Sequence, residues 1–167
     1  MPGCKVDDKA SPQFNRLRKQ WRCGGYPQID KDLKQAFEAI SENILAKKAR
    51  RVQAGSNVVC YKYRQNSSDI RRGENYGWRI YALYDVMTAT LYPIIVYPKQ
   101  AWDNADTATI LAAIREIRTI LGYCVSSGCD GRMGPVEPIE KRQEGNMCHV
   151  KTQCGKCGTV HWKPDYV

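Results

Sequence analysis

The chain has 167 residues, of which 43% are hydrophobic, so it can form one packed domain with an appendage and is not a wholly disordered protein. Its 26 lysines and arginines outnumber its 17 aspartates and glutamates, and the excess lies before residue 123, where 20 cations accompany 12 anions. This charge favours nucleic acid or another acidic surface as the partner; the alternative is a basic protein whose charge only keeps it in solution. No apolar run reaches the roughly 20 residues that span a bilayer, and the polar first residues do not resemble a signal peptide, so we expect a cytoplasmic protein with no membrane partner.

The first predicted element is a helix that begins near Ser11. Ser11 is a suitable N-cap before Pro12, and Phe14, Leu17 and Trp21 follow at helical spacing. Residues 2–8, which precede it, are a poor candidate for a strand.

A second helix is predicted from about Asp30, because apolar residues recur at helical spacing from Leu33 to Leu45, and Gly55-Ser56 would end it. Its predicted C-terminal end carries four cations, which either complement the helix dipole or form a phosphate-facing patch: Lys47, Lys48, Arg50 and Arg51.

Three strands are predicted next, because the runs are rich in Val, Ile and Tyr, and a short connection joins the last two: Val58–Arg64, Trp78–Val86 and Thr90–Tyr97. Side chains alternate between the two faces of a strand. If the three strands pair as neighbours, one face of the sheet gathers four cations and two tyrosines: Lys62, Arg64, Arg79, Lys99, Tyr81 and Tyr97. The opposite face is predicted to pack on the helices through Val59, Tyr61, Tyr63, Trp78, Ile80, Ala82, Tyr92, Ile94 and Val96. Like charges on neighbouring strands destabilise a sheet, so this pattern predicts a bound polyanion such as phosphate.

A third helix is predicted after Asn104 or Asp106, with an apolar stripe of helical period and with Gly122 as its end. These elements predict an α/β (α+β) fold, in which a small, mostly antiparallel twisted sheet packs on two N-terminal helices and a C-terminal helix. We expect residues 1–122 to form this domain and residues 123–167 to form a tail.

The tail is dense in cysteine. Five of the eight cysteines lie in the last 45 residues, together with both histidines. Residues 124–145, which contain two of these cysteines, are rich in Gly, Pro, Ser and charge, and we interpret them as a loop or linker. The spacing Cys-x2-Cys-Gly resembles a zinc knuckle, and four thiolates would complete a structural zinc site in a zinc-ribbon-like tail: Cys124, Cys129, Cys154 and Cys157. Competing ligands are Cys148, His149 and His161. The alternatives to Zn2+ are reduced free thiols and a disulfide.

The order of motifs resembles the RelE/ParE/HigB superfamily of toxins over roughly residues 11–121. The stretches that carry the resemblance are Tyr61-Lys62-Tyr63-Arg64, Arg71-Arg72-Gly73, Gly77-Trp78-Arg79-Ile80-Tyr81 and Tyr97-Pro98-Lys99. The resemblance implies the toxin of a toxin–antitoxin system, a RelE-like mRNA interferase that is a metal-independent endoribonuclease acting on the ribosome. It also implies mRNA, the ribosome and an antitoxin as partners. Members similar to ParE instead inhibit DNA gyrase and are not nucleases.

RNA cleavage by the substrate's own 2′-hydroxyl needs a base, cations at the phosphate and an acid for the leaving oxygen. We expect Lys62 to be the base, because neighbouring cations favour a neutral amine. Arg64 and Arg79 are expected to hold the phosphate, Lys99 to bind phosphate or donate a proton, and Tyr97 or Tyr81 to orient the 2′-hydroxyl or stack on a base. Further RNA contacts are expected from Lys47, Lys48, Arg50, Arg51, Arg71, Arg72 and Tyr81.

Each of these assignments has an alternative. Lys62 and Arg64 can be solvated residues on an open sheet face, and Tyr81 can serve packing alone. Arg79 can form a structural ion pair with Asp85 or Glu74. For the whole protein, the alternatives are a non-catalytic ParE-like toxin that binds a protein target, and a nucleic-acid-binding module that contains zinc and has no catalytic activity.

Overall fold

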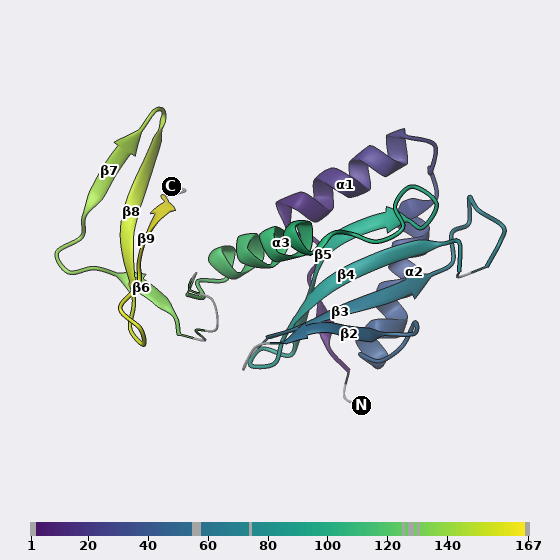
Figure 1. Ribbon diagram of the computed structural model, residues 1–167, viewed down its shortest axis with the longest axis horizontal. Helices are drawn as coiled ribbons and strands as arrows, with labels where there is room; N and C mark the ends of the chain where they lie inside the picture. Colours follow the sequence, from purple (N-terminus) through teal and green to yellow (C-terminus); the bar gives the residue numbers. More distant parts are fainter. Residues whose placement is uncertain are drawn as a thin grey trace. The chain divides into compact units, whose positions relative to one another are not determined.

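The computed structural model describes residues 3–54, 58–73, 75–124, 126, 129 and 131–165. The predicted break at Gly55-Ser56 and the proposed ion-pair partner Glu74 lie outside these residues. The chain divides into two compact units, Met1–Ile117 and Arg118–Val167 (Figure 1).

Two helices begin the first unit, as predicted: α1 (Pro12–Cys23) and α2 (Ile29–Glu42). The N-cap of α1 is Ser11, whose Oγ accepts a hydrogen bond from the backbone N–H of Phe14 at 3.2 Å. In α2 the apolar stripe is buried at Ile29, Leu33, Ala36 and Ile40, which gives the helix one face for the core.

The prediction that the second helix continues to its basic cluster is wrong. After α2 the backbone of Asn43 is extended, and Lys47 and Lys48 have φ angles of 57° and 53°. Arg50 then begins strand β2 (Arg50–Ala54), which pairs antiparallel with β3 (Val58–Gln65). The backbone at Arg50 and Arg51 therefore forms hydrogen bonds with β3 and not within a longer helix. The four cations do not lie at the C-terminal end of α2 and do not complement its dipole.

A five-stranded sheet forms the centre of the first unit, in the order β1-β5-β4-β3-β2. Strands β4 (Trp78–Asp85) and β5 (Thr90–Pro98) match the prediction closely. Among the strands of the described residues, the one parallel pair is that of β1 (Lys5–Val6) with β5. The expectation that residues 2–8 contain no strand is therefore wrong. Lys5 is placed by its N–H, which donates to the carbonyl of Ala89 at 3.0 Å, a tertiary contact that a local pattern does not reveal.

One face of this sheet packs on α1 and α2, and the core contains Phe14 and Leu33 from the helices with Tyr63, Trp78 and Val96 from the strands. The predicted membership of that face is wrong at Tyr92. Pairing shifts between Tyr81 and Ala82, so that β5 carries one extra residue. Because each one-residue shift exchanges faces, Leu91 joins the core and Tyr92, which pairs with Leu83, lies on the other face.

Helix α3 (Thr107–Ile120) follows the sheet and is capped by Asp106, whose Oδ1 accepts a hydrogen bond from the N–H of Thr109 at 2.8 Å. It buries Ala113, Ile114 and Ile117 on one side. In the described part of the chain no helix has the length and apolar character needed to cross a bilayer.

The second unit contains four short antiparallel strands: β6 (Met133–Pro135), β7 (Lys141–Glu144), β8 (Met147–Cys154) and β9 (Val160–Pro164). The other three strands, β6, β7 and β9, all pair with β8. The interpretation of residues 124–145 as a linker is wrong where β6 and β7 form. All four residues of β7 are exposed, so the strand has no buried face and its sequence has no alternation to detect.

A buried carboxylate fixes the connection between β3 and β4. Asp32 of α2 is 1% exposed, and its Oδ2 accepts hydrogen bonds from the N–H of Ser68 and from Nε1 of Trp78, both at 2.9 Å. Asp32→Ala is expected to lower the free energy of unfolding by about 3 kcal/mol, because three donors lose their acceptor, the N–H and hydroxyl of Ser68 and the buried indole of Trp78. Urea denaturation measures this value. The control is Asp30→Ala, which removes only partly exposed ion pairs with Arg18 and Arg22 and is expected to cost less than about 1 kcal/mol. Equal losses in the two variants would contradict the role of Asp32.

Candidate nucleic-acid interface and metal centre

The strand pairing assembles cations on the sheet face opposite α1 and α2. In the register, Lys62 lies beside Arg50 and Tyr81, and Arg64 lies beside Arg79. Arg79 is in turn paired with Tyr97, and Lys99 follows Tyr97 by two residues. Paired residues of an antiparallel sheet point to the same side, so the predicted convergence of charges is confirmed. We call this surface the cationic face and define it by Arg50, Lys62, Arg64, Arg79, Lys99, Tyr81 and Tyr97.

The charges of the cationic face act on Lys62. Partial burial and four neighbouring cations lower the pKa of its amine below the ordinary lysine value, and in decreasing order of effect these cations are Arg79, Arg64, Arg50 and Lys99. The sequence predicts that Lys62 is the base, and both its partial burial and the nearby cations shift its amine toward the neutral form that a base needs.

Lys62 is half-buried and is not simply solvated. Its Nζ donates a hydrogen bond to Oδ1 of Asn104 at 2.8 Å and lies 5.3 Å from the centre of the Tyr81 ring. Arg64, two residues after Lys62 in β3, is exposed and accessible to a ligand.

Arg79 is covered. It is 4% exposed, and its guanidinium donates to the carbonyl oxygens of Trp78 at 3.3 Å and Asn75 at 2.8 Å. The suggested ion pair with Asp85 is wrong, because Asp85 lies six residues farther along β4, about 20 Å away at the rise of a strand. In this position Arg79 acts on Lys62 through its charge.

Both tyrosines of the cationic face are buried, Tyr81 at 3% and Tyr97 at 0% exposure. Their rings stack with centres 6.3 Å apart, and the Tyr97 hydroxyl accepts a hydrogen bond from the N–H of Ala105 at 3.0 Å. Burial raises the pKa of the Tyr81 hydroxyl above its usual range. Trp102 packs against Tyr97 at 5.0 Å between ring centres, so packing accounts for both tyrosines.

The other predicted RNA-contacting residues are dispersed. Lys99 is partly exposed, and its Nζ binds Oδ1 of Asp103 at 2.7 Å. Arg51 pairs with Tyr61 and so lies on the opposite side of the sheet from Arg50. Arg71 and Arg72 are exposed in the loop between β3 and β4, and Lys47 and Lys48 precede β2.

Sequence reasoning did not assign Asn104 a contact with Lys62. Asn104 was considered only as a helix cap. The two residues are 42 positions apart, so no local spacing predicts that contact.

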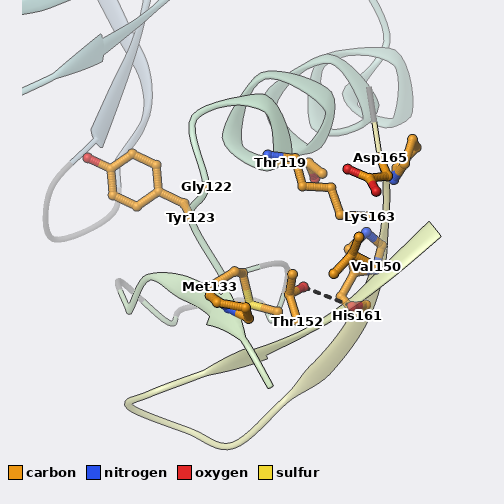
Figure 2. Close-up of a pocket in the computed structure, with 11 residues that line it drawn as sticks. Thr119, Gly122, Tyr123, Met133, Val150, Thr152, His161, Lys163 and Asp165 are labelled. Carbon is orange, nitrogen blue, oxygen red and sulfur yellow. Dashed lines mark hydrogen bonds between the residues drawn. The ribbon is translucent and has the colours of Figure 1, made fainter. Parts of the chain in front are cut away.

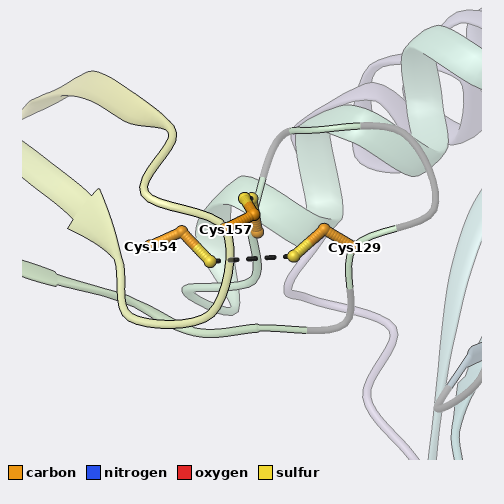
Figure 3. Close-up of side chains that lie close together, drawn as sticks. Cys129, Cys154 and Cys157 are labelled. Atoms are coloured by element: carbon orange, nitrogen blue, oxygen red, sulfur yellow. Dashed lines mark hydrogen bonds between the residues drawn. The ribbon is translucent and has the colours of Figure 1, made fainter.

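The second unit brings four thiols together. The Sγ atoms of Cys124, Cys129, Cys154 and Cys157 all lie within 4.8 Å of one another, with 3.6 Å between those of Cys124 and Cys157. The Sγ atoms of Cys129 and Cys154 are 3.7 Å apart (Figure 3). Tetrahedral zinc with Zn–S bonds of about 2.3 Å needs sulfur atoms roughly 3.8 Å apart, so these four residues can hold a metal such as zinc.

Backbone N–H groups face the thiols, as expected for sites that hold thiolates. The amides of Ser126, Gly131 and Lys156 each lie 3.4 Å from the Sγ of the cysteine two residues earlier in the chain. The guanidinium of Arg118 also donates to the carbonyl oxygens of Cys124 and Cys129 and so holds both loop ends. Within the described residues, the metal-binding group includes none of the competing ligands, Cys148, His149 and His161.

A pocket of about 520 Å³ lies within the second unit (Figure 2). Met133 and Val150 contribute apolar surface, and His161 and Lys163 contribute polar groups. The Thr152 hydroxyl donates to the carbonyl oxygen of His161 at 2.8 Å, which ties β8 to β9 at its wall.

We compared the chain with protein-family models, curated proteins and solved structures. No protein-family model and no curated protein matches the chain. Among solved structures, the chain is similar to a double mutant of the Escherichia coli toxin RelE in the free state, with 18% identity and a TM-score of 0.40 over 70% of this chain and 99% of that chain.

Proposed function

We propose that the cationic face binds and cleaves RNA. The observation that carries the proposal is the convergence of four cations on Lys62, an arrangement that is unfavourable for the sheet and that, together with partial burial, lowers the pKa of Lys62. A phosphodiester backbone is the ligand that offsets such repulsion, and the ribose 2′-hydroxyl supplies a nucleophile that DNA lacks.

In the proposed reaction, neutral Lys62 removes the proton of the 2′-hydroxyl. The 2′-oxygen then bonds to the adjacent phosphorus and the bond from phosphorus to the 5′-oxygen breaks, which leaves a 2′,3′-cyclic phosphate and a 5′-hydroxyl. Arg64, which is exposed, binds the phosphate oxygens, and the Lys99 ammonium protonates the leaving oxygen. Arg79 contributes its charge from beneath the surface.

The test uses a fluorescent single-stranded RNA and the same oligonucleotide with 2′-deoxyribose at every position. We expect cleavage of the RNA to products that end in 2′,3′-cyclic phosphate and no cleavage of the DNA. The rate should rise with pH and level off above the lowered pKa of Lys62, because the base acts only in its neutral form. Cleavage of both oligonucleotides would contradict attack by the 2′-hydroxyl.

A second candidate is binding without catalysis, which the burial of Arg79 and Tyr97 favours. Its signature is a band shift that weakens with salt while the RNA stays intact. Intact mRNA together with double-strand DNA breaks would instead support a ParE-like action on gyrase.

The resemblance of the sequence to the RelE/ParE/HigB toxins extends the proposal to partners. We propose that the substrate is mRNA on the ribosome and that an antitoxin protein covers the cationic face. Mapping of mRNA ends in a translation extract tests the first point, since cuts within codons that depend on ribosomes are expected.

For the second unit we propose a structural Zn2+ held by Cys124, Cys129, Cys154 and Cys157. The spacing of the four Sγ atoms and the three amides that face them support this site. A bound Zn2+ would supply folding free energy to a unit that has little hydrophobic core of its own.

A further inference from the structure

The segment between β5 and α3 contacts the cationic face, and three of its polar residues are Asp103, Asn104 and Asp106. Two of these are carboxylates with partners of their own: Asp103 binds Nζ of Lys99 at 2.7 Å, and Asp106 caps α3 through Thr109. The third is the neutral amide of Asn104, which is the one that accepts a hydrogen bond from Lys62, at 2.8 Å.

We propose that Asn104 is a positioning residue for the base of the proposed RNA cleavage, because its side-chain carbonyl fixes the direction of the Lys62 amine without placing a negative charge beside it. This inference rests on the proposed function for its catalytic meaning, although the contact itself can be tested without RNA.

The neutrality of the acceptor matters because of what else faces Lys62. The charged and titratable groups near it are Arg50, Arg64, Arg79, Lys99, Tyr81 and Tyr97, and on the segment of Asn104 itself the carboxylate of Asp103, which is paired with Lys99. The four cations favour the neutral amine, and a carboxylate at position 104 would cancel much of their effect.

A neutral amine has one lone pair and two N–H bonds. With one N–H directed at Asn104 Oδ1, the lone pair can take only one of the two remaining positions on the nitrogen, whose centre lies 5.3 Å from that of the Tyr81 ring. A positioned lone pair is what proton removal from a 2′-hydroxyl requires.

The experiment compares Asn104→Asp, Asn104→Ala and the control Gln100→Glu in the full chain. The two amide-to-carboxylate changes add the same charge to the same segment, but the Gln100 side chain bonds the Tyr26 hydroxyl at 2.8 Å and does not contact Lys62. The pKa of Lys62 is followed by NMR of carbon-13-labelled lysine in the absence of RNA, with the signal assigned from the spectrum of Lys62→Arg.

We expect Asn104→Asp to raise the pKa of Lys62 by about one pH unit or more and to move the pH profile of cleavage to higher pH, while Gln100→Glu does neither. Asn104→Ala should leave the profile in place and lower kcat about tenfold or more with little change in KM, because orientation is lost and RNA binding is not.

Equal small effects of Asn104→Asp and Gln100→Glu on the Lys62 pKa would overturn the inference, since they would show that Asn104 does not touch the amine. A wild-type kcat in Asn104→Ala would overturn it as well. Failure of the proposed function looks different: the NMR shift in Asn104→Asp is present, but the wild-type protein does not cleave RNA.

Discussion

Lys62→Ala is expected to lower the rate of RNA cleavage by about 10² to 10⁴, the usual contribution of a positioned general base, and to leave the fold intact. The side chain is half-buried and makes one hydrogen bond, to an exposed asparagine, so its removal leaves no large cavity and no buried unpaired group. Rates with purified protein and circular dichroism spectra of both proteins measure the two parts of this expectation.

Two control variants test whether a loss of cleavage in Lys62→Ala reflects the loss of a base. Lys62→Arg keeps the positive charge but cannot give up its proton, so it should remain inactive while still binding RNA. Lys34→Ala removes an exposed lysine of α2, on the side of the sheet away from the cationic face, and should cleave like the wild type. Substantial activity in Lys62→Arg would show that Lys62 is a phosphate ligand and not the base. In bacteria the same series predicts growth arrest for the wild type and Lys34→Ala alone.

The second large effect concerns the four thiols. Removal of the metal with a strong chelator, or the substitution Cys154→Ser, is expected to unfold the second unit, because structural zinc sites contribute about 10 to 16 kcal/mol to the folding of small zinc domains. The near-ultraviolet signal of Trp162, which packs against Arg142 at 4.5 Å, reports the state of this unit. Metal analysis of protein purified without chelator should give close to one equivalent of zinc.

The control for this experiment is Cys23→Ser, because Cys23 is an exposed free thiol in the first unit. It should retain one equivalent of zinc and the Trp162 signal. A metal-free protein that keeps that signal would contradict the zinc proposal and would leave the reduced thiols or a disulfide as the explanation of the cluster.

The parts of the molecule that the sequence predicts well are those set by local periodicity. The cap at Ser11, the three strands from Val58 to Pro98 and the helix after Asp106 follow from patterns within a few residues. The convergence on the cationic face also follows, because alternation along neighbouring strands carries over to their shared surface.

The errors arise where contacts distant in sequence decide the structure. Arg50 continues a helical pattern but pairs with Lys62 in a strand, and Lys5 becomes a strand residue through the carbonyl of Ala89. Periodicity shows which side of a strand a residue faces but not how much of that side other segments bury, so the burial of Arg79 and Tyr97 could not be predicted.

The extra residue in β5 has a consequence for how this surface can be lost or gained. Ile94 lies between Pro93 and Ile95, which pair with consecutive residues of β4. Deleting Ile94 would make Pro93 and Ile95 adjacent, so that Ala82–Pro93 and Tyr81–Ile95 would become consecutive pairs of a regular ladder and each remaining residue of β5 would keep its side. A one-residue insertion after Ile95 would instead turn Tyr97 and Lys99 to the opposite side relative to Ile95, so the surface could be lost while every basic side chain remained in the sequence.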